Sequence, residues 1–143
     1  MTNSTKINTE KAPKPVGSYP HARKIGNLLF LSGVGPRISG SDANDSQVPG
    51  LVLDKNGNYE SFDFEAQCHS VFNNVKSILE ASGSSWENLV DVTVFLTNMK
   101  RDFKTYNRIY AEYFKDNQPC RTTIEISSLP TPIAIELKCI ATV

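Results

Sequence analysis

Two stretches with helical periodicity, each lying between stretches of strand character, most constrain how this chain can fold. In residues 64–79, apolar side chains recur at helical spacing until a Ser-Gly pair at 82–83 stops the pattern. A second stretch follows Asp102, where aromatic residues keep helical spacing up to Phe114. With the flanking β-branched segments, the predicted order is β-β-α-β-α-β-β. This order indicates an α+β fold in which both helices cover one face of a mixed sheet.

The earlier strands are predicted from local patterns. Residues 22–25 and 28–31 flank Gly26-Asn27, a two-residue signal for a tight hairpin. Between the helices, residues 89–97 alternate valine and leucine with polar or aromatic residues, which is typical of a strand with one well-buried face. The strands also carry apolar residues on their other face. Self-association is the economical way to cover that face.

Residues 119–143 place an arginine and a glutamate on two further strands. Both flanks are rich in β-branched residues, and two prolines between them cannot continue a ladder. We therefore expect two antiparallel strands joined by a short loop, with Arg121 opposite Lys138. Thr123 then lies opposite Glu136, and all four side chains share one face. An ordinary cross-strand ion pair is the competing interpretation of Arg121 and Glu136, and a one-residue slip would separate them onto opposite faces.

Length and charge limit the kinds of partner. The chain has 143 residues, which suffices for one domain with a real core and leaves no room for a second. Fifteen Lys and Arg balance 15 Asp and Glu, so the formal net charge is zero, which argues against nucleic acid or an anionic membrane as the main partner. The sequence has no signal-like segment and no run of about 18 apolar residues. Three cysteines, an odd number without metal spacing, are typical of a reducing compartment. We expect a soluble, cytoplasmic protein.

Three segments are expected to be loops. Residues 1–12 are predicted to be a flexible arm, which becomes ordered only near Tyr19. Residues 38–60 carry many turn-forming residues and few apolar ones, which predicts a long surface excursion with a turn at 54–57. The run from Gly33 to Arg37 directly follows a strand, where free backbone N–H groups can approach a ligand. A plain turn is the alternative for that run.

The available side chains exclude several reaction types. Ser32 has no nucleophile-elbow motif, no cysteine has a histidine at a recognisable spacing, and two histidines with scattered carboxylates give no metal pattern. What remains is a guanidinium, a carboxylate, a tyrosine and hydroxyl or amide donors. This set suits hydrolysis of an already reactive C=N bond, which needs only an oriented water, proton transfers and a clamp for the substrate's carboxylate. We expect neither a cofactor nor a metal.

Short motifs from about residue 12 to the end match one family in the family's own order. They are Gly17-Ser18-Tyr19, Ser32-Gly33, Asp102-Phe103 with Asn107, Pro119-Cys120-Arg121, Leu129-Pro130 and Ile135-Glu136. On these motifs the chain resembles the RidA (YjgF/YER057c) family of imine deaminases. The resemblance implies a chorismate-mutase-like fold assembled as a homotrimer, with a cleft at each subunit interface. Whether trimers pair into hexamers is left open.

The resemblance also implies roles for individual residues. Arg121 would bind the carboxylate of a small-molecule substrate, and Glu136 would orient and deprotonate the attacking water, after which ammonia leaves. Tyr19 would close the cleft or donate a proton. The other implied site residues are Ser32, Gly33 and Asn107. Thr123 stands where many family members carry a cysteine, so chemistry attributed to that thiol does not carry over.

Within the family, residues 32–37 and the long excursion look closest to 2-aminomuconate deaminases, which convert 2-aminomuconate and water to 4-oxalocrotonate and ammonia in aromatic catabolism. This substrate has a carboxylate at each end, so we expect a second cation beside Arg121. Arg37 is the best candidate, although a solvated loop arginine is the competing interpretation. A general 2-iminoacid hydrolase and a non-catalytic trimeric binding module remain alternatives. A ribonuclease-like activity fits the zero net charge poorly.

Overall fold

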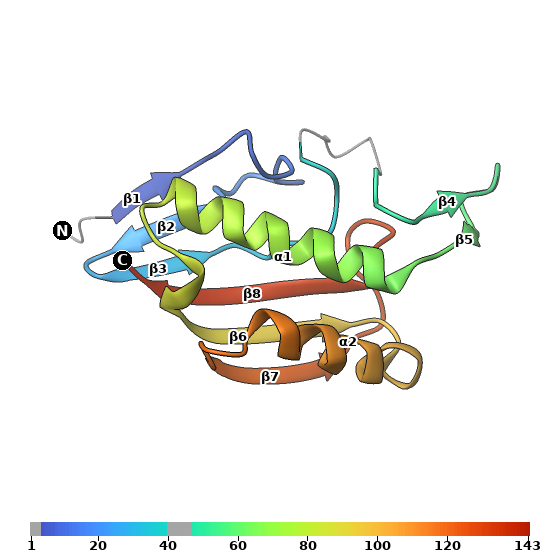
Figure 1. The fold of residues 1–143 in the computed structure, drawn as a ribbon. Coiled ribbons are helices and arrows are strands. Elements are labelled where there is room, and N and C mark those ends of the chain that lie inside the picture. The colour runs from blue at the N-terminus through green and yellow to red at the C-terminus, as the bar shows by residue number, and fades with distance from the viewer. Residues whose placement is uncertain (1–3, 40–46) are drawn as a thin grey trace.

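The computed structural model describes residues 4–39 and 47–143 of the chain. Six strands form one sheet in the order β1-β2-β3-β8-β6-β7, and two helices cover one of its faces (Figure 1). The strands of this sheet are β1 (Ser4–Ile7), β2 (Ala22–Ile25), β3 (Leu28–Leu31), β6 (Leu89–Leu96), β7 (Cys120–Glu125) and β8 (Ile135–Thr142). The remaining elements are β4 (Val52–Leu53), β5 (Tyr59–Ser61), α1 (Phe64–Ala81), the short 3-10 helix η1 (Trp86–Asn88) and α2 (Met99–Tyr113). The predicted α+β fold, with both helices on one face of a mixed sheet, is confirmed.

Both helices begin at a side-chain cap. The carboxylate of Asp63 accepts a hydrogen bond of 3.1 Å from the backbone N–H of Ala66 at the start of α1. The side chain of Asn98 accepts one of 3.0 Å from the N–H of Arg101, so α2 begins at Met99, earlier than the predicted start after Asp102. Such caps stabilise a helix by about 1 kcal/mol. They explain why α2 extends beyond its aromatic stripe.

The core lies between the helices and the sheet. Alternate residues of β8 are buried, and the apolar stripe of α1 packs on them. The buried residues of β8 are Ile135, Leu137, Cys139 and Ala141. Burying each large apolar side chain contributes about 1.5–3 kcal/mol. The remaining residues of β8, including Glu136 and Lys138, face the opposite side of the sheet, which neither helix covers.

The two C-terminal strands are not neighbours, so the predicted antiparallel pair of β7 and β8 is wrong. β6 lies between them and pairs with β7 in parallel and with β8 antiparallel. Residues 126–134 form a connection longer than a tight hairpin loop, which lets the chain pass β6 before it re-enters the sheet. Arg121 is therefore aligned with Val92 of β6 and not with Lys138.

The N-terminal segment differs from the predicted flexible arm. Ser4–Ile7 form β1, which pairs antiparallel with β2, and residues 1–3 lie outside the described residues. The buried side chain of His21 holds the following segment, because its Nδ1 accepts a hydrogen bond of 3.3 Å from the N–H of Thr9. Its Nε2 therefore carries the proton and donates to the carbonyl of Pro13 over 2.8 Å. Residues 4–13 are therefore held in place by the pairing of β1 with β2 and by the two hydrogen bonds of His21. The prediction of a flexible arm is wrong for these residues.

The long excursion after β3 contains a small hairpin of its own. β4 and β5 pair antiparallel, and the predicted turn at 54–57 is confirmed, with Gly57 at φ +81 and the carboxylate of Asp54 accepting from the N–H groups of Asn56 and Asn58. Residues 40–46 lie outside the described part of the chain. The hairpin extends away from the main sheet (Figure 1).

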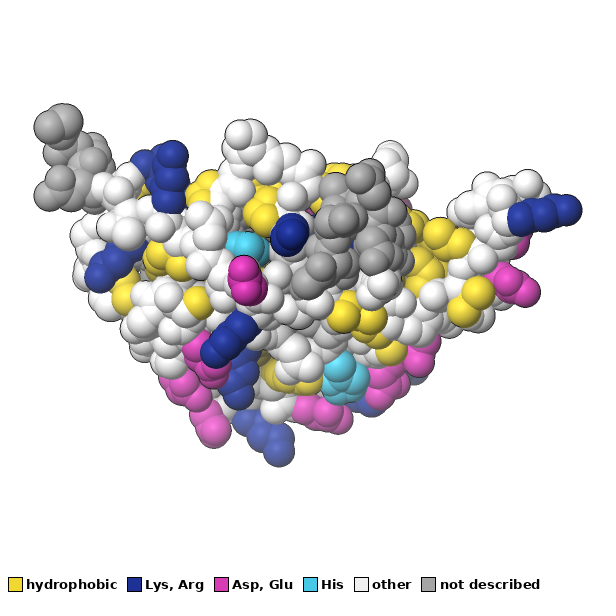
Figure 2. All heavy atoms as spheres, turned by 90° about the horizontal axis from the view of Figure 1, so that it is seen from above, with side chains coloured by type: hydrophobic (Ala, Val, Ile, Leu, Met, Phe, Trp, Pro, Cys, Tyr) yellow, Lys and Arg dark blue, Asp and Glu magenta, His cyan; other side chains and the backbone are white. Residues whose placement is uncertain are grey.

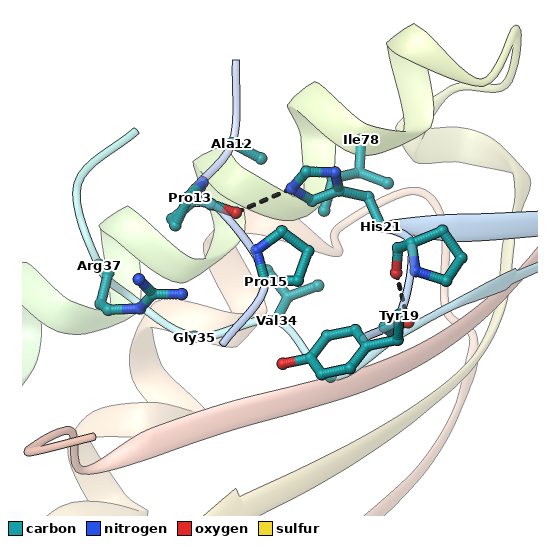
Figure 3. A pocket seen from close by; sticks show the side chains of 12 residues that line it. Ala12, Pro13, Pro15, Tyr19, His21, Val34, Gly35, Arg37 and Ile78 are labelled. Carbon is teal, nitrogen blue, oxygen red and sulfur yellow. Dashed lines mark hydrogen bonds between the residues drawn. The ribbon is translucent and has the colours of Figure 1, made fainter. Parts of the chain in front are cut away.

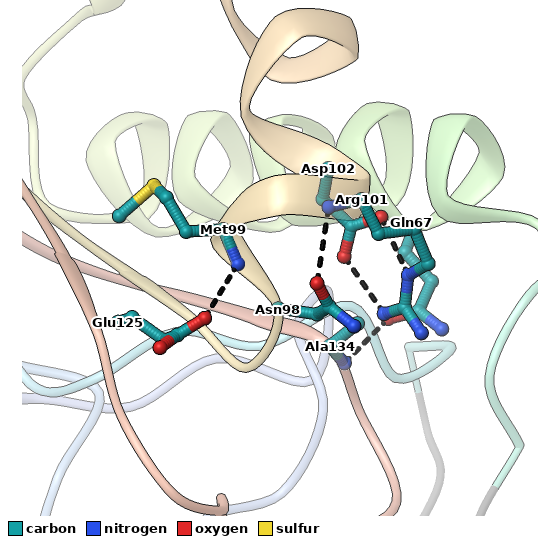
Figure 4. A network of polar contacts seen from close by, with 7 residues as sticks. All are labelled: Gln67, Asn98, Met99, Arg101, Asp102, Glu125 and Ala134. Carbon is teal, nitrogen blue, oxygen red and sulfur yellow. Dashed lines mark hydrogen bonds and ion pairs between the residues drawn. The ribbon is translucent and has the colours of Figure 1, made fainter.

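Polar contacts tie the first turn of α2 and the start of β8 to their neighbours (Figure 4). The carboxylate of Asp102 is only 2% exposed and accepts two hydrogen bonds of 2.8 Å from the guanidinium of Arg101. The buried amide of Gln67 on α1 accepts a bond of 2.9 Å from the N–H of Ala134. Gln67 thereby fixes the point at which the chain enters β8, directly before the strand that carries Glu136.

Candidate active site

Glu136 lies near the beginning of β8 on the face that the helices leave open. It is aligned with Phe95 of β6, and its side chain is half-buried. Burial raises the pKa of its carboxyl above the usual value. A carboxylate that is partly desolvated in this way is a better proton acceptor than one in bulk water, which suits a general base.

Gly33 packs directly against this carboxylate. A Cβ at position 33 would lie 2.7 Å from Oε2 and 2.9 Å from Cδ of Glu136, so the backbone approaches closely only because residue 33 is glycine. Ser32 precedes it and is held by the chain before β2. Its hydroxyl donates to the carbonyl of Pro20 over 2.7 Å, and its N–H donates to the carbonyl of His21 over 3.0 Å. The two predicted loop residues therefore form one rigid wall beside Glu136.

A pocket opens where this wall meets the N-terminal segment, and Tyr19, Ser32, Gly33 and Arg37 all line it (Figure 3). Tyr19 is 42% exposed, and its hydroxyl accepts a hydrogen bond of 3.2 Å from the N–H of Val16. An exposed phenol held at the edge of a pocket can still donate its own proton to a ligand.

Arg37 is a buried residue and not a solvated loop residue. It is 8% exposed, and its guanidinium donates a hydrogen bond of 2.6 Å to the carbonyl of Lys14. Its own carbonyl accepts a bond of 2.9 Å from the side-chain amide of Asn74 on α1. Arg37 therefore places a permanent positive charge in the wall of the pocket and also ties the N-terminal segment to the body of the protein.

Arg121 lies on β7, an edge strand of the sheet, on the side covered by α2. Its guanidinium lies over the ring of Tyr110, with Cζ 4.7 Å from the ring centroid, and donates a hydrogen bond of 2.7 Å to Oδ1 of Asn107. A guanidinium held by aromatic faces and one amide keeps further N–H groups for a carboxylate. Arg121 and Asn107, both predicted site residues, are therefore in contact within one chain.

Three buried hydroxyl groups, two on α2 and one on β7, have no hydrogen-bond partner among the described residues. They belong to Tyr106, Tyr110 and Thr123. Burial raises the pKa of Tyr110 to about 12 and raises that of Tyr106 well above its usual value, so both phenols stay protonated donors. Donors beside a guanidinium favour an acceptor such as a carboxylate.

Arg121 and Glu136 do not meet within one subunit. Arg121 is aligned with the buried residue Val92, whereas Glu136 is aligned with Phe95 on the open face. Because successive residues of a strand point to opposite faces, the two charges lie on opposite sides of the sheet. The predicted constellation is therefore divided into two groups. Tyr19, Ser32, Gly33 and Arg37 line one pocket, and Gly33 connects it to Glu136. Asn107 and Arg121 form the other group.

Three other kinds of site receive no support from the described residues. In residues 4–39 and 47–143, no group of three His, Cys, Asp or Glu side chains is placed to hold a metal ion. No helix in the same part of the chain is long and apolar enough to cross a membrane. On the face shown in Figure 2, basic and acidic side chains are interspersed and no basic patch gathers.

The fold and the positions of these residues can be compared with known proteins. The sequence profile of the family described as endoribonuclease L-PSP matches residues 9–143. The chain belongs to this family. The match confirms the resemblance to RidA and covers every predicted site residue, from Tyr19 to Glu136.

Relatives of this L-PSP family protein are similar over nearly the whole chain. It is 40% identical to a RutC family protein of Pyrococcus horikoshii over 135 residues, which cover 94% of each chain. It is 39% identical over 136 residues to the chloroplastic Reactive Intermediate Deaminase A of Arabidopsis thaliana, covering 95% of this chain and 64% of the relative. The crystal structure of E. coli TdcF with bound serine is similar with a TM-score of 0.80 and 27% identity, over 97% of this chain and 98% of that chain.

Sequence reasoning missed two residues of this L-PSP family protein that contact the site's backbone. His21 holds the segment that carries Tyr19, and the ammonium of Lys138 donates to the carbonyl of Leu31, directly before Ser32. Neither belongs to a motif. The only available signal was a histidine directly before a strand and a lysine on a strand whose other charged residue is Glu136.

Proposed function

We propose that this protein is a hydrolytic deaminase that converts imines or enamines of amino acids to the corresponding oxo acids and ammonia. The observation that carries this proposal is the half-buried carboxylate of Glu136, whose pKa is raised by burial and which packs against the Gly33 backbone. The name of the Arabidopsis relative, Reactive Intermediate Deaminase A, and the serine bound to TdcF support a ligand related to an amino acid.

The reaction needs only groups that the chain supplies. Glu136 accepts a proton from water as the water oxygen bonds to the imine carbon and the C=N electrons move to nitrogen. The nitrogen takes up this proton from Glu136, directly or through Tyr19, and then a second proton, the one that the carbinol hydroxyl gives up. The C–N bond breaks, ammonia leaves, and the carbinol oxygen becomes the new carbonyl. An enamine substrate first moves a proton from nitrogen to carbon to form the imine.

The complete site forms between subunits of a homotrimer in this proposal. Arg121 and Glu136 lie on opposite sides of the sheet, so one chain cannot bind a small carboxylate with the first and attack it with the second. The open face also carries apolar side chains that a second copy would cover. They include Ile25, Leu28 and Ile124, which are 38%, 39% and 39% exposed. Arg121 of one subunit would thus complete the pocket beside Glu136 of another.

Within this class of reaction, we propose 2-aminomuconate as the substrate. Its two carboxylates require two cations, because a desolvated carboxylate without a partner is costly. Arg121 offers the first, and Arg37, buried in the pocket wall near Tyr19, offers the second. The planar guanidinium fork of Arg37 suits a carboxylate better than a lysine ammonium would.

An ammonia-release assay tests this function. Enzymatically generated 2-aminomuconate is compared with the imine of a monocarboxylic amino acid, with RNA cleavage measured in parallel. Faster release from 2-aminomuconate supports the dicarboxylate, and release from both at similar rates supports a general iminoacid hydrolase. Tight binding without ammonia release would favour the non-catalytic binding module, and RNA cleavage without deamination would favour the activity named in the family description.

A further inference from the structure

The ladder between β3 and β8 contains one extra residue beside the site. Phe30 is paired with Ile140, and the next bridge pairs Val34 with Leu137. Between these two pairs the first strand has residues 31–33, whereas β8 has only 138 and 139. Three residues opposite two define a β-bulge, a device that redirects a strand and is common next to active sites.

This bulge produces the contact between Gly33 and Glu136. The N–H and hydroxyl of Ser32 turn away from β8 to the carbonyls of His21 and Pro20, and Gly33 comes to lie on the carboxylate of Glu136. Beyond the bulge the ladder resumes at once, with hydrogen bonds of 2.8 and 2.9 Å between Val34 and Leu137.

The carbonyl of Leu31 is at the start of the bulge, and Lys138 is its side-chain partner. The ammonium of Lys138 donates to this carbonyl instead of extending to solvent, and the residue is half-buried. Lys138 lies on the same face as Glu136, two residues further along β8. A desolvated ammonium persists only where it is well hydrogen-bonded, and the bulge carbonyl provides that bond. Burial lowers the pKa of this amine, as expected for such a position.

We propose that Lys138 is a positioning residue for the deaminase reaction: its ammonium fixes the bulge at Leu31 and thereby holds Gly33 against the carboxylate of Glu136. The inference rests on the proposed function for its effect on rate. The effect on the bulge itself is independent of any substrate. Lys138 touches neither the reacting atoms nor the carboxylate in this role, and it acts only through the backbone of residues 31–33.

A matched set of variants tests this role. Lys138→Met removes the ammonium and keeps a long apolar side chain, and Lys138→Arg retains a donor for the carbonyl. Arg23→Met is the control, because Arg23 is aligned with Phe30 on the same open face but its guanidinium donates to Ser4 on β1, away from the bulge. If Lys138→Met does not yield folded protein, Lys138→Leu, which also removes the ammonium and carries no donor, takes its place.

We expect Lys138→Met to lower kcat by about 10- to 100-fold with a smaller change in KM, since displacement of a catalytic group by about 1 Å costs up to that factor. Lys138→Arg should recover most of the rate, and Arg23→Met should keep it. Amide hydrogen exchange at Val34 and Leu137 should become faster in Lys138→Met alone. A wild-type kcat in Lys138→Met, an equal loss in Arg23→Met, or unchanged exchange at both amides would overturn the proposal. If the wild-type protein deaminates nothing, the proposed function fails while the exchange measurement still decides the role of Lys138.

Discussion

The α-carbon of Gly33 lies so close to the carboxylate of Glu136 that a methyl group in place of its hydrogen would be 2.7 Å from Oε2. Any side chain at this position must displace the carboxylate, because a real Cβ atom essentially never lies under 3.0 Å from another heavy atom. Only the end of the Glu136 side chain has to move, so the consequence should fall on activity and much less on stability.

We predict that Gly33→Ala lowers kcat by about 100-fold and changes the free energy of unfolding by about 1 kcal/mol. Gly35→Ala is the matched control, because its added methyl meets the terminal methyl of Ile133 at 2.9 Å and leaves Glu136 untouched. Steady-state kinetics and thermal unfolding measure the two effects. The prediction is contradicted if both alanine variants lose the same activity, or if Gly33→Ala loses none.

Glu136→Gln should inactivate the protein and stabilise it. The raised pKa means that the folded state holds the Glu136 proton more tightly than the unfolded state does. The free energy of unfolding therefore falls as the pH rises from the usual carboxyl value of 4.5 to the raised one, and the loss persists above it. Glutamine carries no such proton, so the variant should be more stable than wild type at about pH 7 and lose this advantage at about pH 4.

The same titration should shape the activity. Because Glu136 must be ionised to accept a proton, kcat should rise with pH through a pKa above the usual carboxyl value. Glu136→Gln should lower kcat by about 10²- to 10⁴-fold while substrate still binds. A pH–rate profile with its acidic limb at an ordinary carboxyl pKa would indicate that a nearby cation in the active assembly, such as Arg121 of another subunit, offsets the effect of burial. Unaltered turnover in Glu136→Gln would remove Glu136 from the chemistry.

Two inactive variants should restore each other if the site is shared between subunits. Arg121→Ala should lose about 2–5 kcal/mol of substrate binding, and Glu136→Gln should bind without turnover. When both are unfolded together and refolded in equal amounts, about a quarter of the sites in random trimers combine an intact Arg121 with an intact Glu136. Mixing without unfolding is the control. Mass measurement shows whether mixed oligomers form. If they form and stay inactive, either both residues act within one subunit or they do not act in a common site.

Arg37→Ala distinguishes a second carboxylate clamp from a structural arginine. If Arg37 binds the far carboxylate, kcat/KM should fall by about 2 kcal/mol or more on 2-aminomuconate and barely change on a monocarboxylic imine. Lys14→Ala is the control, since Lys14 is exposed and only its backbone carbonyl, which the variant keeps, bonds to Arg37. Equal losses on both substrates would show that Arg37 serves to hold the N-terminal segment.

Local sequence patterns were sufficient to predict where most helices and strands lie. They were not sufficient to predict which strands pair with each other. Helical periodicity located both helices, and alternation located residues 89–96 as a half-buried strand. The pairing of the two C-terminal strands failed because β6 offers ladder bonds on both edges, and no local signal shows that residues 126–134 pass it. β1 was missed because a four-residue strand is too short to show a period. β2 and β3 are equally short, but the turn at Gly26-Asn27 marks them.

The candidate site was predictable residue by residue, but its division into two groups was not. Whether Arg121 and Glu136 share a face depends on the parity of a register that spans three strands, so one misassigned neighbour reverses it. Lys138 and His21 contact backbone carbonyls and amides of other segments, and for Lys138 the partner is 107 residues away. Contacts of that kind leave no motif in a single sequence.

The strand that follows all others in the chain, β8, is also the one that joins the two parts of the sheet. β1, β2 and β3 lie on one side of it, and β6 and β7 on the other. During synthesis, both groups therefore emerge from the ribosome before their common neighbour does, and each exposes an unpaired edge, at β3 and at β6. The interval in which a nascent chain is open to chaperones, or to pairing with another copy, ends only when residues 135–142 have also emerged.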